Sequence, residues 1–239
     1  MTDLQPTKGK LYLIPNTLGT EGASDMLAPW VKQQVHHLLH FVAENEKAAR
    51  ALIKNLQLAA PQSELHFVLL NQHTSLEDKQ TLLNDTLQGH DMGLISDAGL
   101  PCVADPGAEA VALAHQLGIE VVPLHGPSSL LLALMASGFN GQSFAFVGYL
   151  PIEKAERVKR IKELEKEALT KKQTQLFIET PYRNNSLLED LLKNLQPDTQ
   201  LCVAANLTQP NQFIRSTTVQ NWKTNLPDLH KQPAVFVLG

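Results

Sequence analysis

The apolar positions of the chain fall into short runs that alternate with segments of helical spacing. Runs at residues 10–14, 65–70 and 92–96 have the length and composition of buried strands. Between the first two, residues 44–57 carry apolar side chains three and four positions apart, which is typical of a helix with one buried face. This alternation of strands and helices predicts an α/β fold.

One βαβ unit stands out in this pattern. The strand at 92–96 is followed by a helical pattern at 108–117, by Gly118 as a C-cap, and by a second strand at 119–122. Such a unit is expected to pair its two strands in parallel, with a right-handed crossover between them. The loop 97–107 is therefore expected at the carboxyl edge of the sheet, where open α/β folds bind ligands.

The pattern changes beyond residue 124. Apolar runs then follow one another with fewer helical segments between them, which predicts more antiparallel pairing. The predicted strands are 144–147, 174–179, 201–205, 213–216 and 234–238, and the predicted helices are 153–169 and 185–195. We expect two domains: residues 1–124 form an N-terminal α/β domain with a largely parallel sheet, and residues 125–239 form a C-terminal α/β domain with a mixed sheet.

Composition narrows the class of protein. The chain has 239 residues, of which 43% are hydrophobic, so it can fill cores of ordinary size. No apolar run approaches the roughly 20 residues of a membrane span, and the polar residues 1–10 lack the apolar centre of a signal peptide. We therefore expect a cytoplasmic protein with no membrane partner. The net charge of −4 argues against binding nucleic acid over the whole surface, so any RNA contact is expected to be local.

The sequence contains few residues suited to binding a metal or to covalent catalysis. The only cysteines, Cys102 and Cys202, lie far apart, and His36, His37 and His40 have no further ligand at a recognised spacing, so we expect no metal. The phosphate-binding patterns GxGxxG and GxxxxGK[ST] are absent, and so is the nucleophile pattern GxSxG. Binding and positioning of a ligand remain the expected functions.

The loop of the βαβ unit contains two breaks of different chemistry. Asp97 stands where the strand ends, and Ala98 with Gly99 leaves room for a ligand to approach the backbone, although a simple turn explains these residues equally well. Further on, Asp105 is a predicted N-cap of the next helix and Pro106 its predicted first residue.

Three later motifs place polar groups at the ends of elements. Ser128 or Ser129 can cap a helix, and capping alone is commoner than ligand binding there. Glu179 ends a predicted strand and Arg183 follows after a turn, which suits a site as well as a plain ion pair. The mixed charges of residues 153–162 are typical of a solvated helix face, with contact to RNA phosphates as the alternative.

Taken in order, these motifs resemble those of the tetrapyrrole methylase superfamily, the class III fold of S-adenosylmethionine-dependent methyltransferases. The resemblance covers most of the chain and rests on the segments SDAGLP at 96–101, DPG at 105–107, VPLHGPS at 122–128, GYLP at 148–151 and ETPYR at 179–183. It implies two α/β domains, a homodimer, and S-adenosylmethionine as cofactor in a cleft between the domains.

The resemblance also implies which residues hold the cofactor. They are Asp97, Ala98, Gly99, Pro101, Ser128, Ser129, Ile178, Glu179, Asn206, Leu207, Pro233 and Ala234. The members that the chain resembles most methylate a ribose 2′-hydroxyl, so ribosomal RNA is the implied substrate. For this acceptor Glu179 is a candidate catalytic base or else a cofactor contact, and Arg183 is a candidate substrate residue that orients Glu179 or contacts phosphate.

Several segments depart from the family pattern: PNTLG at 15–19, ENEK at 44–47, ANLTQ at 205–209 and KQP at 231–233. Two alternatives therefore stay open beside an RNA methyltransferase. One is a methyltransferase of a tetrapyrrole or another small molecule, which the acidic net charge favours. The other is a non-catalytic module that binds the cofactor.

Overall fold

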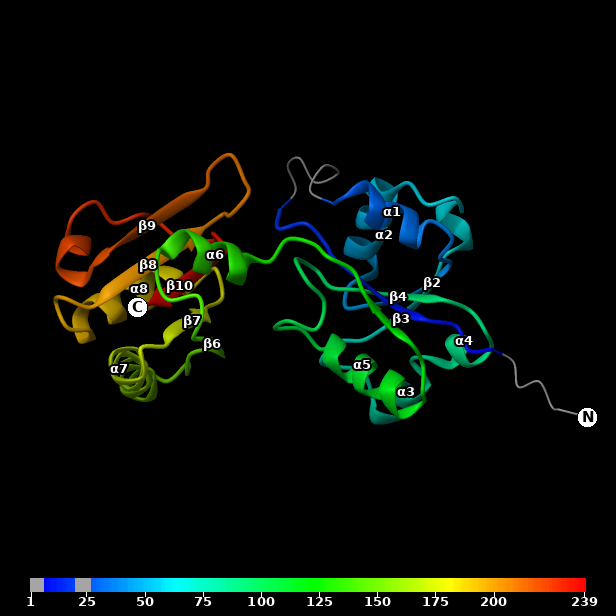
Figure 1. Ribbon diagram of the computed structural model, residues 1–239, viewed down its shortest axis with the longest axis horizontal. Coiled ribbons are helices and arrows are strands. Elements are labelled where there is room, and N and C mark those ends of the chain that lie inside the picture. Colours follow the sequence, from blue (N-terminus) through cyan, green and yellow to red (C-terminus); the bar gives the residue numbers. More distant parts are fainter. Residues whose placement is uncertain (1–6, 20–26) are drawn as a thin grey trace, which may run out of the picture. The chain divides into compact units, whose positions relative to one another are not determined.

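The chain forms two compact units, Met1–Pro127 and Ser128–Gly239 (Figure 1). The computed structural model describes residues 7–19 and 27–239. Each unit has its own sheet and its own buried cores, so the predicted α/β fold is confirmed in both. In the described part of the chain, no helix combines the length and the apolar character that a membrane span requires.

The first unit is built on a five-stranded parallel sheet in the order β3-β2-β4-β1-β5. Its strands are β1 (Leu11–Ile14), β2 (His40–Ala43), β3 (His66–Leu69), β4 (Met92–Ile95) and β5 (Val121–Pro123). Its helices are α1 (Pro29–Val35), α2 (Glu46–Leu56), α3 (Leu76–Thr81), α4 (Asn84–Leu87) and α5 (Gly107–Gln116), with a 3₁₀ turn η2 (Gln62–Glu64).

Helices cover both faces of this sheet (Figure 1). α1 and α2 pack on one face, where Val35, Ile53 and Phe41 are buried together. α5 packs on the other face, where Ala110 lies in one core with Val42. Because side chains alternate along a strand, neighbours such as Phe41 and Val42 enter different cores, and both faces of the sheet need apolar residues.

The predicted βαβ unit is right in its elements and wrong in its pairing. β4, α5 and β5 follow one another as expected, but β1 pairs with both β4 and β5 and lies between them. The sequence does not show this, because strand order depends on contacts between distant segments. The apolar pattern also misses α1, α3 and α4, since each has seven residues or fewer.

The second unit is built on a five-stranded mixed sheet in the order β6-β7-β10-β8-β9. Its strands are β6 (Phe144–Tyr149), β7 (Thr174–Ile178), β8 (Gln200–Ala205), β9 (Phe213–Thr218) and β10 (Ala234–Leu238). β6 and β7 are parallel, and the other neighbours are antiparallel. Its helices are α6 (Ser129–Ser137), α7 (Lys154–Lys171) and α8 (Asn184–Asn194), with a 3₁₀ turn η3 (Val219–Lys223).

The faces of the second sheet are covered by different helices. α6 packs over β10 and β8, where Leu134 and Val237 are buried in one core. α7 and α8 cover the other face, with Ile161, Leu191 and Trp222 in a larger core. This arrangement leaves one long side of α7 exposed to solvent.

A buried ion pair joins α7 to α8. Arg157 donates from Nε and Nη2 to Oδ2 of Asp190 at 2.9 and 2.7 Å, and the two side chains are only 10% and 5% exposed. Arg157 Nη1 also donates to the carbonyl of Ile152 at 2.7 Å, which fastens the segment after β6. This ion pair is buried and is also hydrogen-bonded to the backbone. It therefore holds α7 in one position.

We expect Asp190→Ala to lower the free energy of unfolding by about 3–5 kcal/mol, because it leaves the Arg157 guanidinium buried without its partner. The neighbouring Glu189 forms an exposed pair with Lys193 at 3.2 Å, so Glu189→Ala is the matched control and should cost about 0–1 kcal/mol. Urea unfolding of the two variants measures the difference. Equal losses would show that the buried pair does not anchor α7.

Candidate functional site

The carboxyl ends of β1 and β4 lie side by side at one edge of the first sheet. The two strands are neighbours, while the helix after β1 packs on one face of the sheet and the helix after β4 on the other. Open α/β sheets bind ligands at such an edge, where the chain leaves neighbouring strands toward opposite faces. The predicted cofactor loop 97–101 lies at this edge.

Asn16 ties the two loops together. Its side-chain amide donates to the carbonyls of Ser96 and Asp97 at 2.9 and 3.0 Å, and its backbone N–H donates to Gly99 at 2.8 Å. Asn16 is 7% exposed, so these bonds satisfy polar groups that water does not reach. Asn16 is a site residue that the sequence analysis did not identify, because its partners lie some eighty positions away.

Two residues of the loop after β4 are open to solvent. Asp97 and Ala98 are exposed, whereas Gly99 and Pro101 are buried. Gly99 has a φ of +69°, and a Cβ there would lie 3.2 Å from Leu18 Cδ2, so both conformation and space favour glycine. The structure thus leaves Asp97 and Ala98 open to a ligand and uses Gly99 to turn the chain.

The predicted capping role of Asp105 is wrong in its detail. α5 begins at Gly107 with Pro106 in the N-cap position, so Pro106 is not the first helical residue. The Asp105 carboxylate instead bridges the loop, since it accepts from the Gly107 N–H at 2.7 Å and from the Cys102 N–H at 3.0 Å. It thereby holds Cys102 and Ala104, whose φ angles of 69° and 63° are unfavourable for residues with a Cβ.

The bridge also explains the glycine of the DPG motif. A Cβ at position 107 would lie 2.8 Å from Asp105 Oδ1 and 3.1 Å from Leu94 Cδ2. Any side chain at Gly107 would therefore push the carboxylate off its two donors. Asp105 and Gly107 act together to shape the loop.

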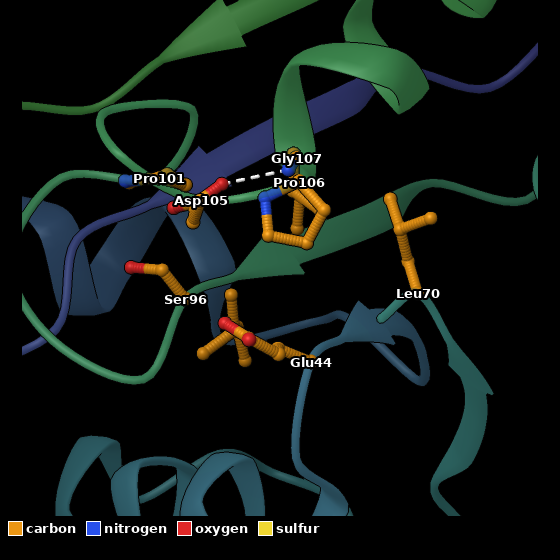
Figure 2. A pocket seen from close by; sticks show the side chains of 9 residues that line it. Glu44, Leu70, Ser96, Pro101, Asp105, Pro106 and Gly107 are labelled. Carbon is orange, nitrogen blue, oxygen red and sulfur yellow. Dashed lines mark hydrogen bonds between the residues drawn. The ribbon is translucent and has the colours of Figure 1, made fainter. Parts of the chain in front are cut away.

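The space under this loop is too small for a cofactor. Glu44, Ser96 and Asp105 line a cavity of about 10 Å³ (Figure 2), which is about the size that holds one water molecule. Figure 2 also shows the bond from Asp105 to Gly107 at the start of α5. A ligand of this loop must therefore contact its exposed side.

Three carboxyl groups lie near one another here. Partial burial, followed by the charges of Asp97 and Asp105, raises the pKa of Glu44 above its ordinary value. Asp97 is exposed as a residue, yet partial burial of its carboxyl group and then the charge of Asp105 raise its pKa as well. The edge of the first sheet is thus a region of negative potential.

The thiol groups are poor nucleophiles. Burial and then the charge of Asp105 raise the pKa of the Cys102 thiol to about 11. Burial raises that of Cys202 to about 11. Since the thiolate is the reactive form, neither cysteine offers covalent catalysis at neutral pH.

In the second unit the strand register brings six predicted cofactor residues to one edge. Ala234 of β10 pairs with Ala205 of β8, and Val235 pairs with Ile178 of β7. Because β10 runs antiparallel to both neighbours, its first residue lies beside their carboxyl ends. The residues that share this edge are Ile178, Glu179, Asn206, Leu207, Pro233 and Ala234.

Side-chain amides fix the loops of this second edge. Asn206 adopts a left-handed φ of 48°, donates its backbone N–H to Pro233 at 3.0 Å, and donates its side-chain amide to Gln232 Oε1 at 2.7 Å. Asn184 donates to the Gln232 carbonyl at 2.6 Å. Asn184 and Gln232 are further residues that the sequence analysis did not identify, because no local pattern reports a bond between positions 184 and 232.

Glu179 and Arg183 form an ion pair, which is one of the two interpretations that the sequence allows. Arg183 Nη2 lies 2.6 Å from Glu179 Oε1, and the same oxygen accepts the Thr180 N–H at 2.6 Å. The Glu179 side chain is 1% exposed, whereas that of Arg183 is 35% exposed. Arg183 Nε and Asn184 Oδ1 are buried and have no hydrogen-bond partner among the described residues.

Ser128 caps α6. Its backbone is extended, its Oγ accepts from the Leu131 N–H at 3.4 Å, and Ser129 is the first residue of the helix. This long bond leaves the first helical N–H groups only weakly satisfied.

Three histidines, His40, His66 and His90, lie at the opposite, amino edge of the first sheet. His40 stacks between His66 and His90, with ring centroids 4.9 and 4.7 Å away, and its Nδ1 lies 2.6 Å from Asp85 Oδ2. Within residues 7–19 and 27–239, no group of three or more His, Cys, Asp or Glu side chains has an arrangement suited to a metal ion.

Comparison with known proteins identifies the family. The family model of the Tetrapyrrole (Corrin/Porphyrin) Methylases matches residues 18–222. The chain belongs to this family. The resemblance that the motifs indicate is thereby confirmed, and the chain is a methyltransferase.

Relatives of this methylase share most of its length. The "Ribosomal RNA small subunit methyltransferase I" of Vibrio cholerae is 30% identical over 86% of the chain and 67% of the relative. The protein of the same name from Synechocystis sp. is 32% identical over 87% of the chain and 71% of the relative. A crystal structure of the methyltransferase CobJ matches 97% of the chain and 94% of its own with a TM-score of 0.63, and at 19% identity it shows the shared fold.

The raised pKa of Glu44 predicts how the methylase responds to pH. Its folded state binds this proton more tightly than the unfolded state, so the Glu44 contribution favours folding at acid pH and is lost as pH rises through the folded pKa. We expect Glu44→Gln to raise the melting temperature at pH 7 and to have little effect below the ordinary glutamate pKa of about 4.3.

Thermal unfolding of Glu44→Gln between pH 4 and pH 8 measures this effect. The exposed Glu64 supplies the control, and Glu64→Gln should leave the melting temperature nearly unchanged at every pH. A stabilisation by Glu44→Gln that does not vary with pH would contradict the crowding of carboxyl groups at this edge.

Proposed function

We propose that this methylase transfers a methyl group from S-adenosylmethionine to a ribose 2′-hydroxyl of small-subunit ribosomal RNA. The observation that carries the proposal is the pair of relatives named as small-subunit ribosomal RNA methyltransferases, which align over most of the chain at 30% and 32% identity. The methyltransferase CobJ supports the fold alone. The homodimer that the resemblance implies stays a prediction.

Polar groups beside the candidate cofactor residues support binding of such a ligand. Asp97 and Ala98 are exposed at the first edge, and their carbonyls already accept from Asn16 and Ser96. At the second edge, Arg183 Nε and Asn184 Oδ1 lack hydrogen-bond partners among the described residues. A ligand with both donors and acceptors would supply the missing hydrogen bonds. The residues proposed to hold the cofactor are Asp97, Ala98, Gly99, Pro101, Ser128, Ser129, Ile178, Glu179, Asn206, Leu207, Pro233 and Ala234.

The cofactor, when bound, supplies an electrophilic methyl group on a sulfonium. The hydroxyl oxygen forms the new C–O bond while the C–S bond breaks, the sulfur keeps the electron pair, and the hydroxyl proton leaves to a base or to water. The protein's task is to orient the acceptor, and positioning of this kind contributes about 7–11 kcal/mol. This agrees with the absence of an activated nucleophile among the described cysteines.

Glu179 suits a positioning role better than that of a base. Its Oε1 already accepts from Thr180 and Arg183, and the side chain is almost fully buried. A general base must come within hydrogen-bond reach of the proton that it removes. We therefore assign Glu179 to fixing Arg183, whose partly exposed guanidinium is the group placed to contact an RNA phosphate.

The substrate is tested by transfer of tritium from labelled S-adenosylmethionine. We expect incorporation into small-subunit ribosomal RNA that lacks the modification, and protection of one ribose from alkaline cleavage. Incorporation into a tetrapyrrole such as uroporphyrinogen, with none into RNA, would replace the proposal by the small-molecule alternative. Tight cofactor binding by calorimetry with no transfer to either acceptor would indicate a non-catalytic module.

Glu179→Gln and Arg183→Gln test the positioning role. We expect each variant to lower kcat/KM for RNA, the double variant to be little worse than either alone, and the pH profile to keep its shape, because the two residues act as one unit. If Glu179 were a general base, Glu179→Gln alone would reduce kcat about 100- to 10,000-fold and would remove the acidic limb of the profile. Steady-state kinetics from pH 5 to pH 9 distinguishes the two results.

A further inference from the structure

The charges of the chain are divided unequally between its two units. Residues 1–127 contain 7 Lys and Arg against 14 Asp and Glu, a net charge of −7. Residues 128–239 contain 13 against 10, a net charge of +3. The acidic total of the whole chain therefore conceals a basic second unit.

Much of this positive charge lies on α7. Lys159, Lys162 and Lys166 are exposed and stand three and four positions apart. With 3.6 residues per turn they fall within roughly 60° of arc, as one stripe that runs about 10 Å along the helix. We call these three residues the lysine stripe.

Three carboxylates of α7, those of Glu163, Glu165 and Glu167, are engaged by other groups. Glu163 and Glu167 lie 3.2 Å from Arg160, and Glu167 also pairs with Lys171. Glu165 is buried and accepts from the Gln196 N–H. Among the described residues, no carboxylate lies within ion-pair distance of the lysine stripe. Its charge is therefore directed at solvent.

The helix that carries the stripe is held rigidly. The buried Arg157–Asp190 pair joins α7 to α8, while Glu153 caps its first turn through a bond to the Glu156 N–H at 2.8 Å. A regular row of ammonium groups on a fixed helix matches the repeated negative charge of a nucleic acid backbone.

We infer that the lysine stripe of α7 is a contact surface for the phosphate backbone of the RNA substrate. This inference rests on the proposed function, because it assumes an RNA acceptor. Lysine contacts to phosphate fix the register of the RNA on the protein and carry no base specificity. They also release counterions, so each contact adds to the salt dependence of binding.

The test compares two triple variants of equal charge. The stripe variant is Lys159→Gln with Lys162→Gln and Lys166→Gln. The control is Lys171→Gln with Lys193→Gln and Lys223→Gln, which removes three exposed lysines of the same unit outside the stripe. Binding of in vitro transcribed small-subunit ribosomal RNA is measured by filter binding at several salt concentrations, and cofactor affinity by calorimetry.

We expect the stripe variant to bind RNA more weakly and to reduce the slope of log K against log salt by about 2 to 3, since each phosphate contact contributes about 0.7 to 0.9. The control should keep the slope within one unit, and both variants should keep their cofactor affinity. The KM for RNA should rise in the stripe variant with kcat unchanged.

Two outcomes would overturn the inference. Equal losses in both variants would show a dependence on net charge alone. Normal binding of naked RNA by the stripe variant, with weaker binding of the assembled ribosomal subunit, would point to an acidic protein instead. Failure of the proposed function is distinct, because the unaltered chain would then transfer no methyl group to RNA.

Discussion

The hydrogen bonds of Asn16 hold the first unit in the form that can serve a ligand. Parallel strands bring the ends of β1 and β4 together, and backbone bonds from Asn16 to Gly99 and from Gly99 to Thr17 join the loops that follow. The Asn16 amide adds bonds to the carbonyls of Ser96 and Asp97. With the two loops joined in this way, Asp97 and Ala98 remain exposed while Gly99 is buried.

Amide side chains perform the same task at the edge of the second sheet. Asn206, which leaves β8 in a left-handed conformation, is held by Gln232, and Gln232 is held in turn by Asn184. Neutral amides can donate and accept at once, so they join loops without adding charge. Both candidate edges are thus shaped by asparagines whose partners are backbone carbonyls or another amide.

This explains how much of the molecule the sequence predicts. Strands such as β7 and β10 and helices such as α7 are predicted within a few residues, because burial imposes a local period on the chain. The position of β1 between β4 and β5, the partners of Asn16, and the bridge from Asp105 to Cys102 leave no local period. The order of the motifs along the chain was enough to predict the family and the candidate loops. The contacts that shape those loops could not be predicted, because they join segments that only the fold brings together.

The division of charge has a chemical consequence for the proposed reaction. A sulfonium cofactor is cationic and the RNA backbone is anionic, so one protein surface cannot attract both. The carboxyl groups of Glu44, Asp97 and Asp105 make the edge of the first sheet negative, which favours a cation and repels phosphate. The second unit carries the net positive charge and the lysine stripe. An acidic chain can therefore act on RNA, because its basic residues are gathered in one unit and its carboxylates in the other.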